Sequence, residues 1–422
     1  MRLGYLLTLA AKSAWNRRGT LSLVAFSIAL STALLLGVER IRTQVKESFV
    51  QTISGTDLIV GSRGGDIQLM LYAAFHIGSA TNNMSWQSAE AIAARSDVAW
   101  TIPVSLGDSH RGYPVVATNL NFFERYKFRG DRNIAFADGA AFADLFDAVL
   151  GAETAKRLKY KIGDQIVLSH GESQTKLAEH NDKPFRIAGI LAPTGTTLDR
   201  SLYISLEAME ALHIDWQGGA PIQGFNVSPE QARKFNLEPK NITALLVGLK
   251  KRAGVFALQR DIGAWKIEPL IGVMPGVAMD KIWRMSSALE NALMFVSVMV
   301  TITGLAGLIS AILAGLNERR LELAVLRSAG ARPFDIVALL AFEALLLTLI
   351  GIICGGGALT ALIAIFSPIL ANSYGVALYL SAPSASELML TAAILVAGFC
   401  AGLIPAIKAY RISLSDGLSI AA

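Results

Sequence analysis

The chain has 422 residues but only two cysteines, Cys354 and Cys400. Two cysteines are too few for a disulfide scaffold, in which several bridges replace a hydrophobic core. Charged residues are also scarce, at 17% of the chain against about 25% in an ordinary soluble protein. Hydrophobic residues, by contrast, make up 53%. Intrinsic disorder is therefore excluded, because disordered chains are rich in charge and poor in apolar side chains.

Several catalytic motifs are missing as well. The sequence contains no G-x-x-x-x-G-K-[ST] loop, which would cradle the phosphates of a nucleotide. It contains no G-x-S-x-G or H-E-x-x-H motif and no paired-cysteine motif. We therefore predict a non-catalytic chain that has no catalytic residue, no metal site and no directly bound cofactor.

Four long apolar stretches account for the excess of hydrophobic residues. Each contains at least 20 residues, and together they carry a single charged side chain, Glu343. A helix of about 20 apolar residues can span a bilayer because it satisfies its own backbone hydrogen bonds. The first stretch is longer than the apolar part of a signal peptide, so we expect an anchor and not a cleaved leader. The predicted spans are 19–38, 292–316, 336–366 and 388–407.

The distribution of lysine and arginine predicts which side of the membrane each segment faces. These residues precede the first stretch and recur in segment 317–335 and after residue 407, but the loop between the last two stretches has none. The positive-inside rule therefore places both termini and segment 317–335 in the cytoplasm. The net charge of +5 and the pI of about 9.1 then indicate membrane topology and not a nucleic-acid partner. The other predicted segments are a cytoplasmic interfacial helix (1–18), an extracytoplasmic domain (39–291), a short external loop (367–387) and a cytoplasmic tail (408–422).

The region between the first two stretches has the composition of a soluble domain and mixes extended with helical patterns. The predicted fold is a membrane protein with four transmembrane α-helices and a large α+β extracytoplasmic domain inserted between helices 1 and 2. We predict two subdomains, of which the outer covers about 110–240. The predicted strands are 163–169, 185–191, 201–204, 242–249 and 265–270, and the predicted helices are 149–158, 206–212 and 253–262.

Segment 317–335 has the pattern of a short amphipathic helix followed by a turn. Leu321, Ala324 and Val325 recur at the i, i+3, i+4 spacing of one helix face. Gly330 and Pro333 then predict the end of this helix and a turn into the third span. A helix of this kind can dock in a cleft of a partner protein. A plain basic loop that satisfies the positive-inside rule accounts for the same charges.

Polar and small residues within the spans each allow two interpretations. A charge inside a span is costly, so we expect Glu343 to be hydrogen-bonded in a structural role, with a proton pathway as the alternative. Gly304 and Gly307 in the second span, and Gly351 and Gly355 in the third, allow helices to approach closely. They could pack within one bundle or against a second copy of the chain.

The five histidines form no pair at the i, i+3 or i, i+4 spacing. His170 and His180 flank a polar loop with several acidic residues, which could bind a metal weakly. We favour a solvated hairpin tip for this loop. His76 lies just before the asparagine-rich turn that contains Asn82 and Asn83, and these three residues could mark a surface for a periplasmic partner.

Several segments together resemble the permease subunits of MacB/FtsX-type ABC transporters. NERRLELAVLRSAGARPFDI (317–336) is similar to the family's cytoplasmic loop after the second span, and LIPAIKAYRISLSDGL (403–418) to its carboxyl-terminal exit. GTDLIVGSRGGDIQLMLYAAFHIGSATNN (55–83) resembles a subgroup of that family. The segments that resemble its outer periplasmic subdomain are VLGAETAKRLKYKIGDQIVL (149–168), FRIAGIL (185–191) and TGTTLDRSLYISLEAMEAL (194–212).

The resemblance implies a permease subunit that works with a separate cytoplasmic ABC ATPase, and ATP and Mg²⁺ would be bound by that partner. It also implies a multi-pass protein of the bacterial inner membrane, a second permease copy in a homodimer, and a periplasmic adaptor or lipoprotein as a further partner. The residues expected to couple to the ATPase are Glu318, Arg319, Arg320, Leu321, Glu322, Val325, Arg327 and Gly330.

The mechanism that the resemblance implies is mechanotransmission. ATP hydrolysis would move the periplasmic domain and so drive export or release of a lipoprotein, lipid, peptide or drug-like molecule. Two alternatives stay open. The chain could be an FtsX-like regulator of a cell-envelope hydrolase without transport, or a secondary transporter that uses Glu343 and no ATP.

Overall fold

The computed structural model describes most of the chain. The described residues are 18–78, 82–130, 132–171, 180–217, 220–222, 225–318, 323, 326–328, 330–374 and 380–411. They fall into two compact units. One is helical, up to Val45 and from Ser286 onwards, and the other is an α/β unit, Lys46–Met285. The predicted interfacial helix at 1–18 and the end of the predicted tail lie outside the described residues, except for Arg18.

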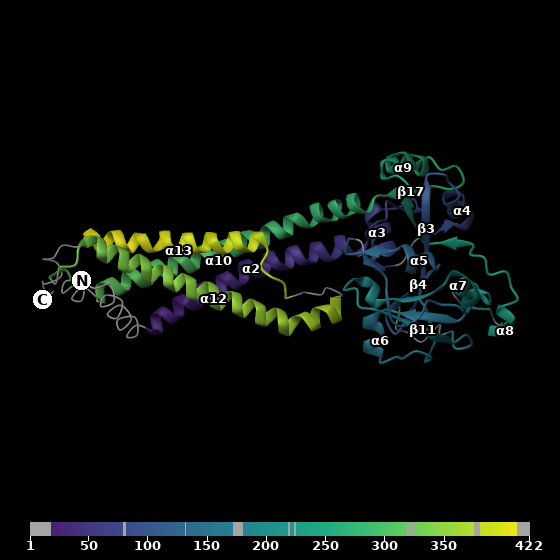
Figure 1. Ribbon diagram of the computed structural model, residues 1–422, viewed down its shortest axis with the longest axis horizontal. Helices are drawn as coiled ribbons and strands as arrows, with labels where there is room; N and C mark the ends of the chain where they lie inside the picture. The colour runs from purple at the N-terminus through teal and green to yellow at the C-terminus, as the bar shows by residue number, and fades with distance from the viewer. Residues whose placement is uncertain are drawn as a thin grey trace. The chain divides into compact units, whose positions relative to one another are not determined.

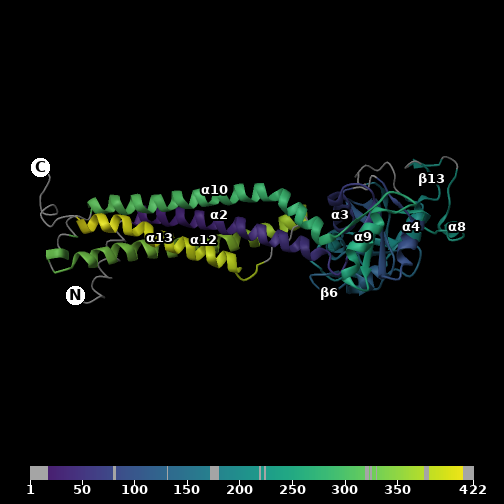
Figure 2. The ribbon, with the colours of Figure 1, turned by 90° about the horizontal axis from the view of Figure 1, so that it is seen from above.

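The helical unit is built from four long helices that lie alongside one another in both views (Figures 1 and 2). All four are long and apolar enough to cross a membrane, as their composition predicts. Apolar side chains from all four form one shared cluster, which includes Ile28, Leu308, Leu340 and Ala401. The helices are α2 (Arg18–Thr52), α10 (Pro275–Glu318), α12 (Pro333–Tyr374) and α13 (Ala385–Arg411).

An ion pair joins α2 to α13 inside this unit. The Arg40 Nε atom donates a hydrogen bond of 2.8 Å to Glu387 Oε1, and a second guanidinium nitrogen donates to Glu387 Oε2. Each side chain is only 6% exposed. The Ser384 hydroxyl accepts a hydrogen bond from the Glu387 backbone N–H at 3.2 Å, which fixes the start of α13. A buried pair with this two-pronged geometry holds the two helices in one register.

The α/β unit contains one large sheet whose main path runs in the order β17-β1-β16-β3-β4-β12-β8-β11-β7. Two short strands lie beside this path, because β10 pairs with β3 and β9 pairs with β11. The strands of the sheet are β1 (Leu58–Ser62), β3 (Val98–His110), β4 (Tyr113–Thr118), β7 (Phe136–Gly139), β8 (Asp147–Leu150), β9 (Gln165–Ile166), β10 (Ser169–His170), β11 (Phe185–Leu191), β12 (Leu202–Ser205), β16 (Ala244–Leu249) and β17 (Leu270–Val273).

Successive residues of the central strands enter two different cores, one on each face of the sheet. Val115 and Ala117 of β4 belong to the first core, whereas Val116 between them belongs to the second. The first core is covered by α4 (Trp86–Ala93), α6 (Ala152–Leu158), α7 (Leu206–His213), α8 (Pro229–Ala232) and α9 (Val255–Gly263). The second is covered by α3 (Asp66–Phe75), α5 (Asn121–Arg125) and the first turns of α10.

Three two-stranded pairings complete the unit, and they lie outside the main sheet. They join β2 (Met84–Ser85) to β15 (Asn241–Ile242), β5 (Lys127–Phe128) to β6 (Arg132–Asn133), and β13 (Trp216–Gln217) to β14 (Ala220–Pro221). Two 3₁₀ turns, Thr197–Arg200 and Arg252–Gly254, precede β12 and α9 respectively.

Most of the predicted elements of this unit are confirmed, and three are wrong in their bounds. The strand predicted at 163–169 is two separate short strands, because β9 pairs with β11 and β10 pairs with β3. Residues 149–150 belong to β8, and helix α6 begins only at Ala152. Both strand residues are fully buried in the sheet, so tertiary packing overrides the helical pattern. The strand predicted at 265–270 begins only at Leu270. The residues before it are used otherwise: Trp265 donates to the Ser88 hydroxyl, and Glu268 accepts from the Ser85 backbone.

The predicted division into two subdomains near residue 110 stays a prediction. A single sheet crosses that position, because β3 pairs with β16 on one side and with β4 on the other. Strands β16 and β17 both lie antiparallel to β1 and are linked by α9, which confirms the predicted β-α-β connection.

The buried ion pair yields a stability prediction. Replacing Glu387 by Gln leaves the Arg40 guanidinium buried without a counter-charge, which should lower the free energy of unfolding by about 3–5 kcal/mol. Replacing both residues, as Arg40→Met with Glu387→Leu, should recover most of that loss. Unfolding of the full chain in detergent measures both effects.

The neighbouring arginine provides the matched control. Arg42 pairs with Glu290 at 2.9 Å, but its side chain is 44% exposed. The Arg42→Gln change should therefore cost less than about 1 kcal/mol. If Glu387→Gln were no more damaging than Arg42→Gln, the buried pair would not hold the helices together.

Candidate functional site

The segment between α10 and α12 contains the predicted coupling residues. Glu318 is the last residue of α10, and Leu326 is buried at 6% exposure. Leu323 packs against the shared cluster of the helical unit. Arg327 is half-buried and engaged with a neighbouring group. Arg319, Arg320, Leu321, Glu322 and Val325 lie outside the described residues.

The turn at the end of this segment is formed as the sequence predicts. Gly330 has a φ of +96°, in the left-handed region that glycine adopts without a steric penalty. The Ala331 N–H donates to the Leu326 carbonyl and the Gly330 N–H donates to the Arg327 carbonyl, both at 3.0 Å. This is the Schellman pattern that ends a helix. Helix α12 then begins directly at Pro333.

Three of the four predicted packing glycines face α2 within the same chain. A Cβ atom at Gly304 would lie 2.9 Å from the Ser31 hydroxyl, and one at Gly351 would lie 2.7 Å from the Ile28 Cβ. At Gly355 it would lie 2.9 Å from the Thr32 Cβ and would also collide with the Ala29 carbonyl. These glycines therefore serve contacts inside one bundle. Gly307 has no described neighbour within 4 Å of such an atom.

Glu343 lies on α12 and is half-buried. It is engaged with a neighbouring group and is not an isolated charge. Its structural role stays a prediction.

The prediction that His76 belongs to a surface for a periplasmic partner is wrong. This residue ends α3 in the left-handed region, with a φ of 55°, and its side chain is buried. Its Nδ1 atom lies 2.9 Å from the Ser201 hydroxyl oxygen. Burial lowers the pKa of His76 to about 4, so the ring is neutral and serves packing. Asn82 and Asn83 are exposed, as predicted.

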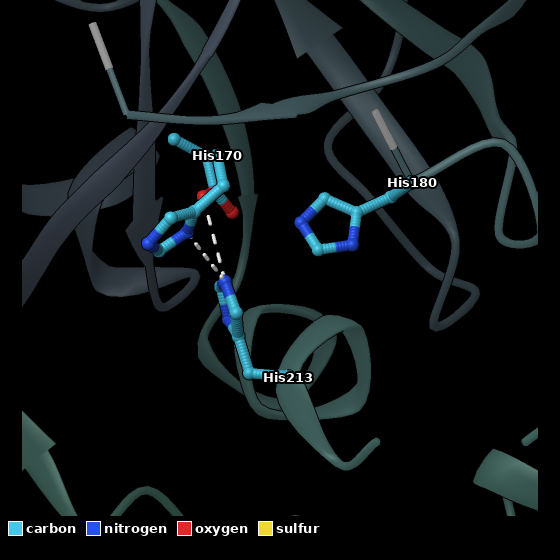
Figure 3. A group of neighbouring side chains, drawn as sticks. His170, His180 and His213 are labelled. Atoms are coloured by element: carbon cyan, nitrogen blue, oxygen red, sulfur yellow. Dashed lines mark hydrogen bonds and ion pairs between the residues drawn. The ribbon is translucent and has the colours of Figure 1, made fainter. Parts of the chain in front are cut away.

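The α/β unit brings together four side chains of the kinds that can bind a metal, and Figure 3 labels the three histidines among them. The four are Asp108, His170, His180 and His213, and their ligand atoms all lie within 4.8 Å of one another. Asp108 and His180 are fully buried, and the other two are partly exposed. The prediction of a solvated tip is thus wrong for His180. The acids expected beside it at 172 and 179 lie outside the described residues.

A bulge in β3 positions the carboxylate of this cluster. The pairing of β3 with β4 shifts register between Leu106 and Ser109, and Asp108 lies within that shift. A bulge re-aims a side chain that a regular strand would direct elsewhere. On the other side of β3, His170 of β10 is the direct cross-strand partner of Asp108. His170 Nδ1 lies 3.0 Å from Asp108 Oδ1.

The third and fourth members come from the chain after β10 and from the end of α7. His213 is the last residue of α7, and its Nε2 atom lies 3.1 Å from His170 Nδ1 and 3.5 Å from Asp108 Oδ1. The His180 ring lies against the Trp216 ring, with 4.4 Å between the ring centroids. The cluster therefore has one wall of aromatic surface and one wall of strand β3.

Electrostatics in the cluster favour a charged aspartate and a neutral His180 ring. Burial alone would raise the pKa of Asp108, but hydrogen bonds from His170 and His213 outweigh it and bring that pKa to about 2. Burial lowers the pKa of His180 to about 4. Burial also disfavours the charged form of His213. The hydrogen bond to Asp108 and the negative charge of Asp108 outweigh this effect and raise the pKa of His213.

Sequence reasoning missed Asp108 and His213 as members of this cluster. Neither lies near His170 or His180 in the sequence, and no spacing rule links them. The one available signal was Gly107-Asp108 within an otherwise extended, apolar-rich stretch, because glycine in a strand often marks a bulge.

An open groove lies at the other end of α7. Its cavity volume is about 710 Å³. Ser205, which caps α7, and Glu207 in its first turn both border it. The remaining lining residues are Asn119, Leu120, Asn121, Phe142, Ala143, Asp144, Leu145, Arg233 and Leu237.

Comparison with known families finds two matches in this chain. The MacB-like periplasmic core domain matches residues 19–263, which is more than half of the chain. The FtsX-like permease C-terminal domain matches residues 294–414. No curated protein matches the sequence.

Comparison of coordinates finds two solved structures that match part of this chain. The periplasmic region of MacB from Actinobacillus actinomycetemcomitans is 10% identical, covers 55% of this chain and 95% of its own, and has a TM-score of 0.34. The extracellular domain of the noncanonic ABC-type transporter YknZ from Gram-positive bacteria is 8% identical, covers 51% and 98%, and has a TM-score of 0.30.

The glycine contacts predict that only one of two adjacent substitutions in α12 lowers the stability of the bundle. Gly355→Ala places a methyl group against Thr32 and the Ala29 carbonyl, which should destabilise the bundle by about 1–3 kcal/mol. Gly356→Ala is the matched control, because nothing described lies within 4 Å of its Cβ position. Unfolding in detergent compares the two variants. Equal stability of the two variants would contradict the packing of α12 on α2.

Proposed function

The chain belongs to the MacB/FtsX-type permeases of ABC transporters, and from that premise we propose that it converts ATP hydrolysis by a partner into movement of its α/β unit. Membership of this family implies a membrane location and a cytoplasmic ATPase partner. The chain contains no phosphate-binding loop of its own. ATP and Mg²⁺ would therefore be bound by the partner subunit.

The observation that carries this proposal is the continuity of α10. This helix has 44 residues, which corresponds to a length of about 66 Å at 1.5 Å per residue. Near its start, Ala278 and Met279 are buried in the second core of the α/β unit. At its other end, Glu318 opens the predicted coupling segment. If the ATPase displaces that segment, helix α10 would transmit the movement to the α/β unit.

The ends of the coupling segment support its role as a docking element. The Schellman turn at Gly330 and the helix start at Pro333 define its exit, and Leu323 packs the segment against the bundle. We propose that the charged residues from Glu318 to Glu322 contact the ATPase, with Leu321 and Val325 on the apolar face.

We further propose that the substrate is handled outside the membrane, by mechanotransmission. The four candidate spans are strongly apolar. Such spans suit a mechanical bundle better than a polar conduit. Substrates of this kind would be a lipoprotein, a lipid, a peptide or a drug-like molecule already in the periplasm or outer leaflet. Gly307 leaves a position on α10 where a helix of a second permease copy could approach closely.

The coupling proposal predicts loss of the ATPase on one substitution. Leu321→Asp should abolish co-purification of a nucleotide-hydrolysing subunit from cells that express the tagged full chain, because a charge replaces the centre of the apolar face. The captured subunit should contain a G-x-x-x-x-G-K-[ST] loop and hydrolyse ATP.

Leu380→Asp is the matched control, since Leu380 is 65% exposed in the loop predicted to lie on the other side of the membrane. It should leave the complex intact. Retention of the ATPase by Leu321→Asp would refute docking at this segment. Capture of a partner without ATPase activity would refute the proposed function.

The proposed orientation predicts which residues a membrane-impermeant thiol reagent reaches. Cys354 and Cys400 are first replaced by alanine, and one cysteine is introduced at Ser96 or Ser328, both of which are exposed. In spheroplasts the reagent should label Ser96→Cys, in the α/β unit, and should label Ser328→Cys only after lysis. The reverse pattern would place the coupling segment outside the cell.

A further inference from the structure

The cluster of Asp108, His170, His180 and His213 has the composition and geometry of a metal centre, and this inference does not depend on the proposed function. Three imidazoles and one carboxylate converge from three elements and one connecting segment. Such convergence is not explained by packing, because each group brings a polar atom into a largely buried space.

The hydrogen bonds of His213 determine which of its nitrogens is available. Its Nδ1 atom lies 2.9 Å from the Met209 carbonyl oxygen, so Nδ1 must carry the hydrogen. Nε2 is the atom that points into the cluster, towards Asp108 and His170. A cation would displace the hydrogen that Nε2 shares with Asp108, and the neutral ring would then offer the Nε2 lone pair to the metal. Metal-binding imidazoles usually donate their other ring N–H to a backbone carbonyl, a carboxylate or water in this way.

Two polar groups of the cluster have no partner within the described part of the chain. Both ring nitrogens of His180 and the Oδ2 atom of Asp108 are buried without a hydrogen bond. His180 is fully buried, so water from the surface does not satisfy it. A buried imidazole of this kind is unfavourable unless a ligand satisfies it. A cation within the cluster would supply that ligand.

The distances between the ligand atoms agree with tetrahedral coordination. Metal–nitrogen bonds of about 2.0–2.1 Å place tetrahedral ligand atoms about 3.3 Å apart. His170 Nδ1, His213 Nε2 and Asp108 Oδ1 are separated by 3.0, 3.1 and 3.5 Å. His180 lies somewhat farther away and would complete the site by a small movement of its ring.

We propose that these four side chains bind a Zn²⁺ ion, contrary to the sequence-based expectation of no metal site. Imidazole nitrogen suits zinc, whereas Mg²⁺ and Ca²⁺ prefer sites made of oxygen. Four protein ligands fill the tetrahedral shell, as in structural and regulatory sites, and leave no open position for catalysis.

The charges around the cluster do not oppose a cation. The charge of Lys183 acts on His180, but this lysine is fully buried and forms ion pairs with Asp182 at 2.7 Å and Asp215 at 2.9 Å. Its positive charge is thus compensated locally. Asp108 contributes a negative charge inside the site, and Glu210 of α7 contributes a second near His213.

A metal at this position would fasten the end of α7 to strand β3. The same short helix carries Ser205 and Glu207 at its start, where both border the groove. Occupancy of the site would therefore stabilise one wall of the groove, and a partner that contacts the groove would respond to zinc.

The test measures metal binding to the full chain alone, purified in detergent with a tag that contains no histidine. After treatment with a chelator, Zn²⁺ affinity is measured by competition with a fluorescent zinc indicator. One ion should bind per chain. Co²⁺ in place of zinc should give the strong visible absorption of a four-coordinate site. Weak binding without a defined stoichiometry, or a six-coordinate Co²⁺ spectrum, would overturn the proposal.

Two variants locate the ion. His180→Gln and His213→Gln should each weaken Zn²⁺ binding by at least about 100-fold, since loss of even an outer-shell partner costs 10–100-fold. His76→Asn is the matched control, because it removes a buried histidine elsewhere and asparagine tolerates the left-handed conformation. It should bind zinc as the parent does.

Folding of each variant is checked by circular dichroism. Should His180→Gln or His213→Gln fail to fold, His170→Gln takes its place, because the His170 side chain is 35% exposed and tolerates change more readily. Folded variants that keep the parent affinity would refute the site. An unchanged Co²⁺ spectrum in His170→Gln would do the same.

Discussion

Lipid offers no hydrogen-bond partner to the polypeptide backbone, and the architecture of the helical unit follows from this constraint. Within the described residues, four long helices meet it. Helices in lipid gain little from burying apolar side chains, so close contact must come from small residues and from polar pairs. Gly351 and Gly355 allow α12 to approach α2, and the Arg40–Glu387 pair joins α2 to α13. The glycine contacts and the ion pair both form between helices whose backbone hydrogen bonds are already made within each helix.

The α/β unit solves a different problem, because it must bury both faces of a wide sheet. Alternate residues of each central strand enter separate cores, and short helices cover each side. The first turns of α10 belong to one of these covers. The helix that leaves the second core is therefore also a helix of the bundle. The proposed mechanical coupling makes use of this continuity of α10 along the chain.

The histidine cluster shows how a group of potential metal ligands can arise from a local irregularity. A regular strand β3 would pair evenly with β4, but the shift between Leu106 and Ser109 re-aims Asp108 towards His170. The last residue of α7 then supplies His213, and Trp216 flanks the His180 ring. Buried polar groups without partners persist in a fold when a function maintains them. The cluster thus resembles a site and not an accident of packing.

The sequence by itself determined the four spans, the α+β insertion between the first two, and the turn at Gly330 and Pro333. These features depend on local properties: apolar length, residue pattern and the conformational freedom of glycine. Tertiary structure alone decided that residues 149–150 are strand, that His76 and His180 are buried, and that three glycines face α2. It alone brought Asp108 and His213 to His170. Asp108 and His170 are 62 residues apart in the sequence, and His170 and His213 are 43 residues apart, so their contacts depend on how distant segments pair. No periodicity within one segment records such pairings.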